Sequence, residues 1–455
     1  MTTAYEYFLR KKATSDVPTG LSTIPPINPM LKPHQADIVK WAIARGRAAI
    51  FADCGLGKTP MQLEWAEKQP HECLIVAPLA VAHQFVREAK KFGVDVGYAK
   101  DQSQITKRIT ITNYERLENF HIEQFGAVSL DESSILKNNT GAYCTWMIEA
   151  FKNTPFRLLA SATPAPNDVM ELGTQAEFLG VMSRSEMLAM YFTHDGGDTS
   201  KWRVKGHAQE AFWEWMTTWA VMIRKPSDLG YSDDGFVLPP LRMHEHQVKS
   251  KETDGYLFAL EALTLQDRQK ARRDSISDRV AECAKLVNES SDQWVVWCNL
   301  NDESAQLAAS IPDAIEVTGS DSDDHKESAI VGFIEGKYRV LVSKPKIAGL
   351  GLNLQNCANT AFVGLSDSYE QLYQSIRRFW RFGQTREVNV HVITAESEGA
   401  VVSNIKRKER DAEETYNNMI LHMKDLNAAA LHGASTRNKT SYCPSVKIII
   451  PEFMK

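Results

Sequence analysis

The sequence predicts an α/β protein of two tandem lobes, each organised around a doubly wound parallel sheet. Its 455 residues are too many for a single hydrophobic core. Two series of short, continuously apolar runs alternate with stretches long enough for crossover helices, which is typical of parallel strands covered on both faces. A tryptophan-rich segment at about 183–250 interrupts this alternation. We therefore expect a helical insertion and connector between the two lobes.

Changes in composition and periodicity along the sequence divide the chain into five segments. We expect an N-terminal leader at 1–28, lobe one at 29–182, the insertion and connector at 183–250, lobe two at 251–398, and a C-terminal helix and tail at 399–455. Closely spaced prolines between 25 and 33 exclude a regular helix there. The segment 399–424 is charged with a helical period, and the tail that follows it cannot be placed.

The first series of elements begins with a helix at 35–44 and a strand at 48–51, followed by a helix at about 60–68. Further strands are predicted at 73–77, 109–112, 127–130 and 157–160, with a crossover helix at 80–91. In the insertion, Trp202, Trp213, Trp215 and Trp219 are expected on helices.

The second series has strands at 294–297, 315–317, 339–342, 361–363 and 388–392. Helical stretches at 304–310 and 325–335 lie between them. Each lobe thus repeats the strand and helix alternation of a doubly wound domain.

Charge and cysteine usage narrow the class of protein. A formal net charge of −5 argues against a chain coated in basic groups, although a local basic groove stays possible. The seven cysteines are scattered and never form a C-x-x-C pair, so we expect reduced thiols without zinc or disulfides. No secretory h-region and no membrane-spanning apolar run is present, which predicts a cytoplasmic protein without membrane contact.

A glycine-rich turn between the strand at 48–51 and the next helix predicts a nucleotide phosphate site. Gly55 and Gly57 let backbone N–H groups approach an anion, and the helix N-terminus adds its positive dipole end. Lys58 can reach the β- and γ-phosphates, and the Thr59 hydroxyl can ligate Mg²⁺. The first glycine of the usual pattern is Ala52 here, so a chance Lys-Thr after a glycine turn is the alternative.

A carboxylate pair follows the strand at 127–130. The carboxyl ends of parallel strands are where such sheets bind ligands, so Asp131 would hold Mg²⁺ and Glu132 would orient or deprotonate the attacking water. Alone, the pair would be read as a solvated strand end, but downstream of a phosphate turn the catalytic interpretation is favoured.

Two arginines spaced by three form the third constellation. On a helix, Arg378 and Arg381 share a face and can both point across an interlobe cleft at the γ-phosphate. The alternatives are a nucleic-acid backbone contact or a solvated basic face, and Arg377, turned away from the pair, fits those better.

The ordered segments of the first lobe resemble superfamily-two helicases and, more narrowly, the Swi/Snf-type DNA translocases. Several stretches carry the resemblance: the adenine-reading motif at 31–35, the phosphate loop at 52–59, the T-x-Y-E segment at 112–115, the D-E-x-x-x-x-K-N segment at 131–138, and the coupling motif at 161–167.

The second lobe extends the resemblance. The stretch 348–354 is similar to the family's A-G-x-G-x-N-L, and Gln374 to Gln384 reproduces the spacing Q-x-x-x-R-x-x-R-x-G-Q, which is specific to the Swi/Snf group. Together the matching segments cover roughly 29–410, and the compact chain is similar to forms found in bacteria and their viruses.

The resemblance implies two RecA-like lobes that clamp ATP and Mg²⁺ between them. By resemblance, Gln35 reads adenine, Leu56 and Gly351 join the glycine turn in binding the nucleotide, and Thr59 with Asp131 holds the metal. The residues that would couple hydrolysis to movement are Ser134, Ser161, Thr163, Gln374 and Gln384.

Two departures from the family pattern concern coupling. Ser134 stands where the family usually has histidine, so this position cannot be charged. Ser161-Ala162-Thr163 replaces T-G-T, a form closer to strand-separating helicases.

Nucleic-acid contacts are implied by the resemblance for both lobes. They are Gln84 and Thr112 from lobe one, and Ser343, Lys344 and the turn at Gly349 from lobe two. Contacts of this kind go mainly to phosphates, so binding would not depend on base sequence and would weaken with salt. The trio of Trp202, Arg203 and Lys205 would either stack on nucleic acid or form a packing cluster.

The sequence therefore predicts a DNA-dependent ATP hydrolase that moves along double-stranded DNA, with a protein partner left open. One alternative is a strand-separating helicase on DNA or RNA, favoured by Ser161-Ala162-Thr163 and opposed by the Gln374 to Gln384 signature. The second is a binding module without turnover, opposed by the presence of Lys58, Glu132 and both cleft arginines.

Overall fold

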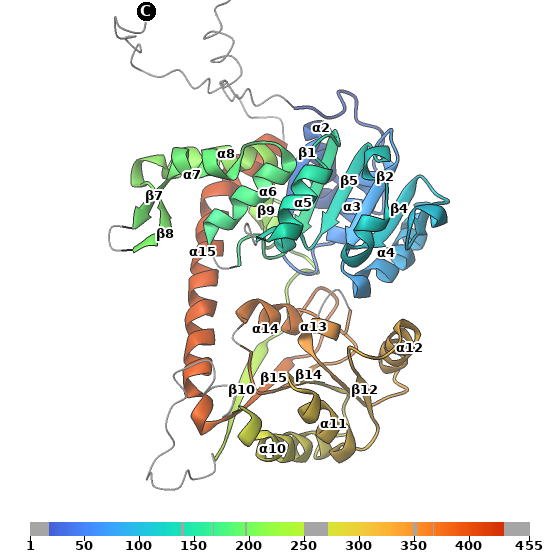
Figure 1. Cartoon of the computed structure of the whole chain (residues 1–455), viewed down its shortest axis with the longest axis vertical. Helices are drawn as coiled ribbons and strands as arrows, with labels where there is room; N and C mark the ends of the chain where they lie inside the picture. Colours follow the sequence, from blue (N-terminus) through green and yellow to red (C-terminus); the bar gives the residue numbers. More distant parts are fainter. Residues whose placement is uncertain are drawn as a thin grey trace, which may run out of the picture.

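Two stacked lobes make up the chain in the computed structural model, which describes residues 18–137, 141–166, 168–195, 198–249, 272–348, 353–366 and 368–431. Figure 1 shows lobe one in blue to green above lobe two in olive to orange, with one long helix running beside both. Each lobe has its own parallel sheet, which confirms the predicted fold class of two tandem doubly wound lobes.

Lobe one is built on a seven-stranded, all-parallel sheet of order β3-β4-β2-β5-β6-β1-β9. Its strands are β1 (Arg47–Ala52), β2 (Cys73–Ala77), β3 (Val96–Tyr98), β4 (Ile109–Asn113), β5 (Ala127–Asp131), β6 (Phe156–Ser161) and β9 (Ala220–Ile223). Alternate residues of β1 enter different cores: Ala49 and Phe51 face one, and Ala48 and Ile50 the other. Burial on both faces explains why the strands read as unbroken apolar runs.

Helices cover both faces of this sheet (Figure 1). They are α2 (Pro33–Arg45), α3 (Lys58–Glu67), α4 (Leu79–Phe92), α5 (Ala142–Ala150), α6 (Leu172–Leu179), α7 (Arg184–Tyr191) and α8 (Gln209–Trp219). Their ends follow local rules, since Pro33 occupies the first position of α2 and Gly93 ends α4 with a φ of 69°.

Lobe two repeats the plan with a six-stranded parallel sheet of order β10-β15-β14-β11-β13-β12. The strands are β10 (Leu241–Val248), β11 (Trp294–Trp297), β12 (Ala314–Val317), β13 (Val340–Ser343), β14 (Asn359–Val363) and β15 (Val388–Ala395). The helices are α10 (Ile276–Asn288), α11 (Asn301–Ser310), α12 (Asp323–Ile334), α13 (Pro345–Ala348) and α14 (Tyr369–Ile376). Two buried clusters again lie on opposite faces of the sheet.

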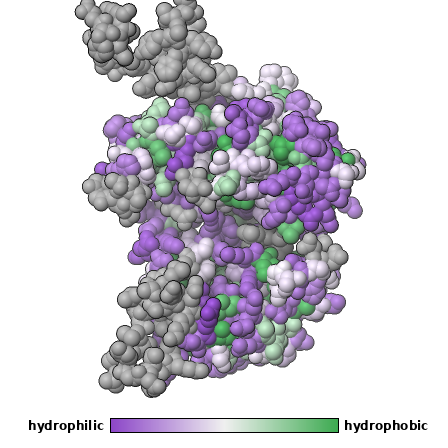
Figure 2. All heavy atoms as spheres, viewed as in Figure 1, coloured by the Kyte–Doolittle hydropathy of each residue, from purple (hydrophilic) through white to green (hydrophobic). Residues whose placement is uncertain are grey.

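Short 3₁₀ turns connect several of these elements. They lie at Gln102–Gln104, Tyr114–Asn119, Ile122–Gln124, Ser133–Lys137, Val169–Glu171, Gly206–Ala208, Pro226–Leu229 and Glu396–Glu398. Among the described residues, no helix has both the length and the apolar character needed to cross a membrane. Hydrophilic and apolar residues are interspersed over the face seen in Figure 2.

The segment 183–250 is only partly an insertion. Its strand β9 completes the sheet of lobe one, and its strand β10 forms the edge of the sheet of lobe two. The true protrusion is the hairpin of β7 (Phe192–Asp195) and β8 (Asp198–Val204), which carries Trp202 on a strand and not on the expected helix. The other three tryptophans lie on α8, as predicted.

The helix α15 (Gly399–Leu431) begins at lobe two and ends against lobe one (Figure 1). Met419 and Met423 join the core of lobe one, and His422 stacks on Trp213 with ring centroids 5.7 Å apart. Arg224 in turn donates to the Asn417 amide oxygen, 2.6 Å away. The predicted C-terminal helix is therefore a bridge between the lobes, and the apolar run at 446–450 lies outside the described residues.

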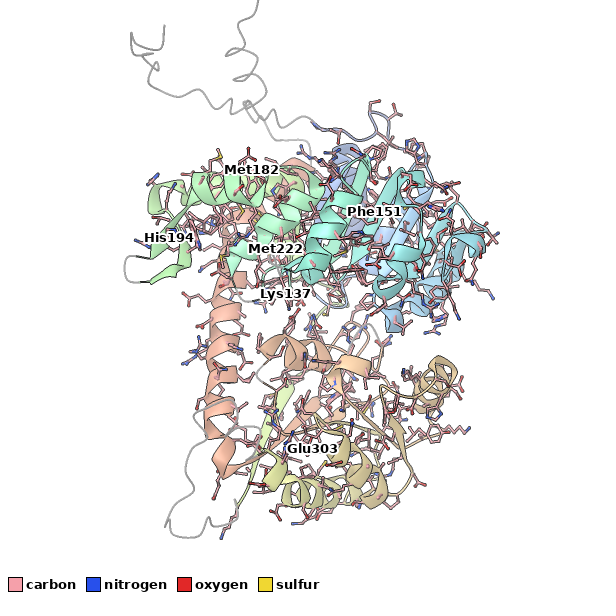
Figure 3. The ribbon with its side chains drawn as sticks, in the orientation of Figure 1. Lys137, Phe151, Met182, His194, Met222 and Glu303 are labelled. Carbon is pink, nitrogen blue, oxygen red and sulfur yellow. The ribbon has the colours of Figure 1, made fainter. Side chains whose placement is uncertain are left out.

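The helix α14 forms much of the polar contact between the lobes. Lys137 of lobe one points down toward lobe two in Figure 3 and pairs with Glu370 of α14. One turn further along, the Gln374 amide donates to the Thr163 hydroxyl, 3.4 Å away. Positions 370 and 374 share a helix face, so α14 presents one polar face to lobe one.

Candidate active site

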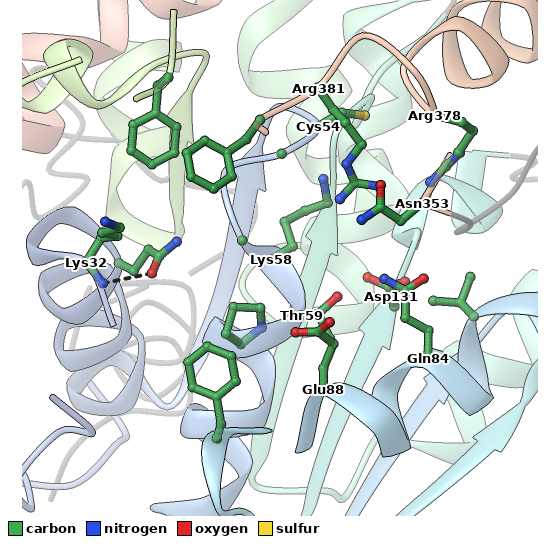
Figure 4. A pocket seen from close by; sticks show the side chains of 18 of the residues that line it. Lys32, Cys54, Lys58, Thr59, Gln84, Glu88, Asp131, Asn353, Arg378 and Arg381 are labelled. Atoms are coloured by element: carbon green, nitrogen blue, oxygen red, sulfur yellow. Dashed lines mark hydrogen bonds between the residues drawn. The ribbon is translucent and has the colours of Figure 1, made fainter. Parts of the chain in front are cut away.

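A cavity of about 300 Å³ lies between the lobes. Sequence-predicted residues from both lobes line it, namely Gln35, Gly55, Gly57, Lys58, Thr59, Gln84, Asp131, Glu132, Arg378 and Arg381. Figure 4 shows Lys58 and Thr59 of lobe one facing Asn353, Arg378 and Arg381 of lobe two. The fold thus brings together residues more than 300 positions apart in the chain.

The glycine turn adopts backbone conformations that require glycine. Gly55 has a φ of 89° and Gly57 a φ of 83°. A Cβ atom on Gly57 would lie 2.3 Å from the Gln35 amide nitrogen, and one on Gly55 would lie 2.9 Å from the backbone nitrogen of Phe382 in lobe two. The turn is therefore packed against Gln35 on one side and the opposite lobe on the other.

Lys58 and Thr59 open helix α3, where the helix dipole favours an anion. The Lys58 ammonium donates to the Ala52 carbonyl, 2.9 Å away, so binding a phosphate means exchanging that bond. The prediction that Leu56 helps to bind the nucleotide is corrected by the position of its side chain. Its side chain is buried in lobe one and does not line the cavity, and its carbonyl serves to fix Gln35.

Gln35 is held by two hydrogen bonds to the backbone. Its amide nitrogen donates to the Leu56 carbonyl and its amide oxygen accepts from the Lys32 N–H, each at 2.9 Å. A planar amide held at both ends has a fixed orientation. Gln35 is therefore preorganised at the wall of the cavity.

Asp131 ends strand β5 at the floor of the cavity. Burial and the neighbouring Glu132 raise its pKa to about 7, although a hydrogen bond from Gln62, 2.8 Å long, favours the ionised form. Glu132 has a φ of 53°, uncommon for a residue with a side chain. Among the described residues, its buried Oε2 atom has no hydrogen-bond partner.

This donor set fits a magnesium ion. Hydroxyl and carboxylate oxygens are the ligands that Mg²⁺ prefers, and Thr59 and Asp131 supply one of each at the cavity wall. A nearby cation would also relieve the repulsion that raises the pKa of the buried Asp131 carboxyl. Thr59 and Asp131 would hold the ion, which would supply positive charge to offset that of the nucleotide phosphates.

Arg378 and Arg381 reach the cavity from a turn and not from a helix. Helix α14 ends at Ile376, and both arginines follow it. Burial, followed by the neighbouring Arg378, lowers the pKa of Arg381 to about 10. Repulsion between two buried cations is relieved by an anion, so this turn is suited to phosphate.

Arg377 is neither solvated nor turned toward nucleic acid, contrary to the sequence prediction. It is buried, and its Nη2 atom lies 2.9 Å from Asp53 Oδ2 in the glycine turn and donates to the Cys54 carbonyl at 2.9 Å. Tyr373 donates to the other Asp53 oxygen at 2.9 Å. Burial is the largest single influence on the pKa of Arg377 and lowers it, but the Asp53 carboxylate, Tyr373 and Cys54 together outweigh burial and raise the pKa above its usual value. We call Asp53, Tyr373 and Arg377 the interlobe clasp.

Comparison with known proteins agrees with this site. Residues 34–191 match the SNF2-related domain model, and residues 278–383 match the helicase conserved C-terminal domain model. The chain belongs to the Swi/Snf group of helicase superfamily two. The first matched model lies in lobe one and the second lies in lobe two.

Individual relatives of this Swi/Snf chain are distant. It is 24% identical over 409 residues to the SWI/SNF-related matrix-associated actin-dependent regulator of chromatin subfamily A-like protein 1 of Xenopus laevis, covering 80% of this chain and 42% of the relative. It is 31% identical over 179 residues to Helicase SWR1 of Debaryomyces hansenii, covering 33% of this chain and 11% of that protein. It therefore spans less than half the length of these relatives.

A solved structure of the Sulfolobus solfataricus SWI2/SNF2 ATPase core in complex with dsDNA is also similar. The match has a TM-score of 0.41 and 17% sequence identity, and it covers 90% of this chain and 98% of that one.

Two residues expected to contact nucleic acid are buried in the Swi/Snf lobes. The Thr112 hydroxyl donates to the Ala99 carbonyl at 2.9 Å, and the Ser343 hydroxyl donates to the Val317 carbonyl at 2.8 Å. Gln84 lines the cavity between the lobes. Only Lys344, which donates to Asn301 at 2.6 Å, is placed at the surface, and Gly349 and Gly351 lie outside the described residues.

The residues predicted to couple hydrolysis to movement fall into three groups by their contacts. Thr163 and Gln374 meet across the lobes, and the Ser161 hydroxyl supports this contact by accepting from the Thr163 N–H at 3.1 Å. Ser134 is buried within lobe one, where the interlobe contact of the same turn is made by Lys137. Gln384 is internal to lobe two, because its amide donates to the carbonyls of Gln355 and Cys357.

Sequence reasoning missed Cys54, Glu88 and Asn353 at the cavity. Glu88 lies one helical turn after Gln84 on α4, and both point toward Thr59 and Asp131 in Figure 4. The four-residue spacing could have flagged Glu88. Cys54 and Asn353 lie within the matched motifs, at positions where the side chain carried no expected role.

Of the trio Trp202, Arg203 and Lys205, Trp202 has a packing role and Lys205 caps a helix. Trp202 packs on the core of lobe one, and its ring lies 3.8 Å from that of His194. The Lys205 ammonium donates to the Ala189 and Met190 carbonyls near the end of α7. These contacts favour the packing interpretation over a nucleic-acid platform.

Proposed function

We propose that the chain is an ATP-driven translocase on double-stranded DNA. The observation that carries the proposal is the composite cavity, in which the glycine turn and carboxylates of lobe one face two arginines of lobe two. A site split between two bodies is complete only when they close, so ATP binding and hydrolysis would change the lobes' relative position.

Each residue has a defined role in the proposed reaction. Lys58 binds the β- and γ-phosphates after leaving the Ala52 carbonyl. The carboxylate of Glu132, a residue that lines the cavity, orients and deprotonates the attacking water. Arg378 and Arg381 stabilise the charge that develops on the transferred phosphoryl group.

The step that couples hydrolysis to movement runs through α14 in this proposal. The helix carries the clasp residue Tyr373 and the Thr163 partner Gln374, and it leads directly into the cavity arginines. Release of the γ-phosphate removes the anion that holds the arginines, which frees lobe two to move. Lys344 and backbone groups near it would grip the phosphate backbone without reading bases.

Strand separation is the second candidate, because Ser161-Ala162-Thr163 has a helicase-like form and Thr163 takes part in the interlobe contact. A displacement assay distinguishes the two. We expect the protein to displace a triplex-forming third strand from an intact duplex when ATP is supplied, and Glu132→Gln to displace none. If forked duplexes are unwound while the third strand always stays bound, the translocase proposal is wrong.

A further inference from the structure

Two phenylalanines at the rim of the cavity are packed together although they come from distant parts of the chain. Phe236 lies in the connector before β10, and Phe382 follows Arg381 in lobe two. Their ring centroids are 4.9 Å apart with planes inclined by 30°. Both side chains line the cavity that contains Gln35 and Lys58. We call Phe236 and Phe382 the aromatic pair.

The aromatic pair exposes apolar surface that a folded protein usually covers. Phe382 is 40% exposed, and Met30, which also lines the cavity, is 57% exposed. Phe236 also packs edge-on against the His34 ring, with ring centroids 5.2 Å apart, and this contact helps to fix the position of the Phe236 ring. The result is an open apolar wall joined to a polar phosphate site, which is the usual composition of a small-molecule pocket.

Gln35 provides the polar group beside this wall. One of its amide N–H groups and one oxygen lone pair bind the backbone of Leu56 and Lys32, which among the described residues leaves one donor and one acceptor for a ligand. A glutamine amide presents this pairing to the N6 and N7 atoms of adenine. The apolar wall is therefore placed to hold the flat face of a base whose edge reaches Gln35.

We propose that the aromatic pair is the base-stacking half of the nucleotide site and that it links the base to closure of the lobes. This inference rests on the proposed function, since it takes the ligand to be ATP. Gly55 packs against the backbone and Cβ of Phe382. The residue that stacks on the base therefore also touches the glycine turn. ADP retains the base, so lobe two keeps a contact with the nucleotide after the γ-phosphate has left.

The two halves of the base site have separable effects. Stacking on an aromatic ring tolerates any base, because every base has a π-face. The Gln35 amide distinguishes bases by their edges. Loss of the aromatic pair should weaken all nucleotides equally, whereas loss of Gln35 should reduce the preference for adenine.

The test measures binding of ADP, GDP and inorganic tripolyphosphate to the full chain by calorimetry. Phe382→Ala should weaken ADP and GDP alike by about tenfold, within the range of one base stacked on one ring. Tripolyphosphate, which has no base, should bind unchanged, and Phe382→Tyr should restore ADP binding. Val237→Ala is the matched control, because Val237 is the neighbour of Phe236 and is 81% exposed.

Several outcomes would overturn the inference. If Phe382→Ala binds ADP as the wild-type protein does, the aromatic pair does not hold the base. If tripolyphosphate binding falls by the same factor as ADP binding, the substitution has disturbed the phosphate turn and the stacking role is refuted. If the wild-type chain binds neither ADP nor tripolyphosphate, the failure lies with the proposed ATPase itself.

Discussion

Glu132 combines an unusual backbone with a carboxylate oxygen that has no hydrogen-bond partner among the residues that the structure describes. Its φ of 53° turns the side chain out of the strand direction just after Asp131. Strained residues of this kind persist where the surrounding structure holds them, and they gather at active sites. In the proposed mechanism the strain aims the carboxylate at the water that attacks the γ-phosphate.

Glu132→Gln should therefore abolish hydrolysis and preserve nucleotide binding. The amide keeps the shape of the side chain but cannot accept a proton, so the rate should fall by about 10²- to 10⁴-fold. Single-turnover phosphate release measures the rate, and calorimetry with ADP measures binding. Hydrolysis at the wild-type rate would remove Glu132 from the mechanism.

Residue positions could be predicted where a motif fixes both spacing and local geometry. Lys58, Thr59 and Asp131 lie at a strand end or helix start, so their positions follow from the sheet. The nucleic-acid contacts predicted for the Thr112 and Ser343 hydroxyls do not fit the structure. Strands covered on both faces bury these hydroxyls, which then bind nearby carbonyls. The prediction for Arg377 was wrong because the side of the chain that it shares with Tyr373 packs against Asp53 of lobe one, a contact between distant segments that helical spacing cannot reveal.

At the scale of elements, β10 and β15 place three histidines together in lobe two. His244 and His391 are paired in the register of the two strands, with ring centroids 4.5 Å apart. His246 Nε2 lies 3.0 Å from His391 Nδ1. The other groups facing this cluster are Trp294, Asn389 and Glu282.

Burial, followed by His244 and His246, lowers the pKa of His391 to about 4 from its usual 6.5. The unfolded chain binds the proton more readily, so the stability that His391 contributes is fully present above pH 6.5 and is lost as the pH falls toward 4. His391→Gln should therefore flatten the decrease of the urea midpoint between those pH values. His121→Gln, at an exposed histidine, is the control and should leave the slope unchanged. Equal slopes in all three proteins would contradict the prediction.

Element boundaries were predicted well where both faces of a strand are buried. They were predicted poorly where one segment supplies strands to the sheets of both lobes. The strand at Trp294–Trp297 has the predicted limits because both of its faces are packed. The segment 183–250 was taken as one unit, yet β9 and β10 are recruited by different sheets. Strand pairing between distant segments leaves no local pattern, so sequence periodicity could not assign either strand.

The whole molecule is held in this arrangement by α15 and by the polar face of α14. Lys137 with Glu370, Thr163 with Gln374, and the interlobe clasp join the same helix region to three turns of lobe one. The ion pair of Asp53 with Arg377 is more buried than that of Lys137 with Glu370, and it joins the glycine turn to the residue beside Arg378. Opening of the cleft must break it.

Asp53→Asn should shift the nucleotide-free protein toward open lobes. Removing one charge of a buried pair leaves the Arg377 cation uncompensated, which costs about 3 to 5 kcal/mol unless the lobes separate and solvate it. Small-angle scattering should show a larger radius of gyration for this variant. Asp95→Asn, which breaks an exposed ion pair with Lys107, is the control and should scatter as wild type. An unchanged radius for Asp53→Asn would show that the clasp does not hold the lobes.

The central claim is that half of one ATP site lies on each lobe, and phosphate release with and without duplex DNA tests it most directly. Lys58→Ala and Arg381→Ala remove one group from each half. We predict that duplex DNA stimulates hydrolysis by the wild-type chain and that both variants stay at background with and without DNA. DNA-stimulated hydrolysis by Arg381→Ala at the wild-type rate would show that lobe one works alone and would contradict the account.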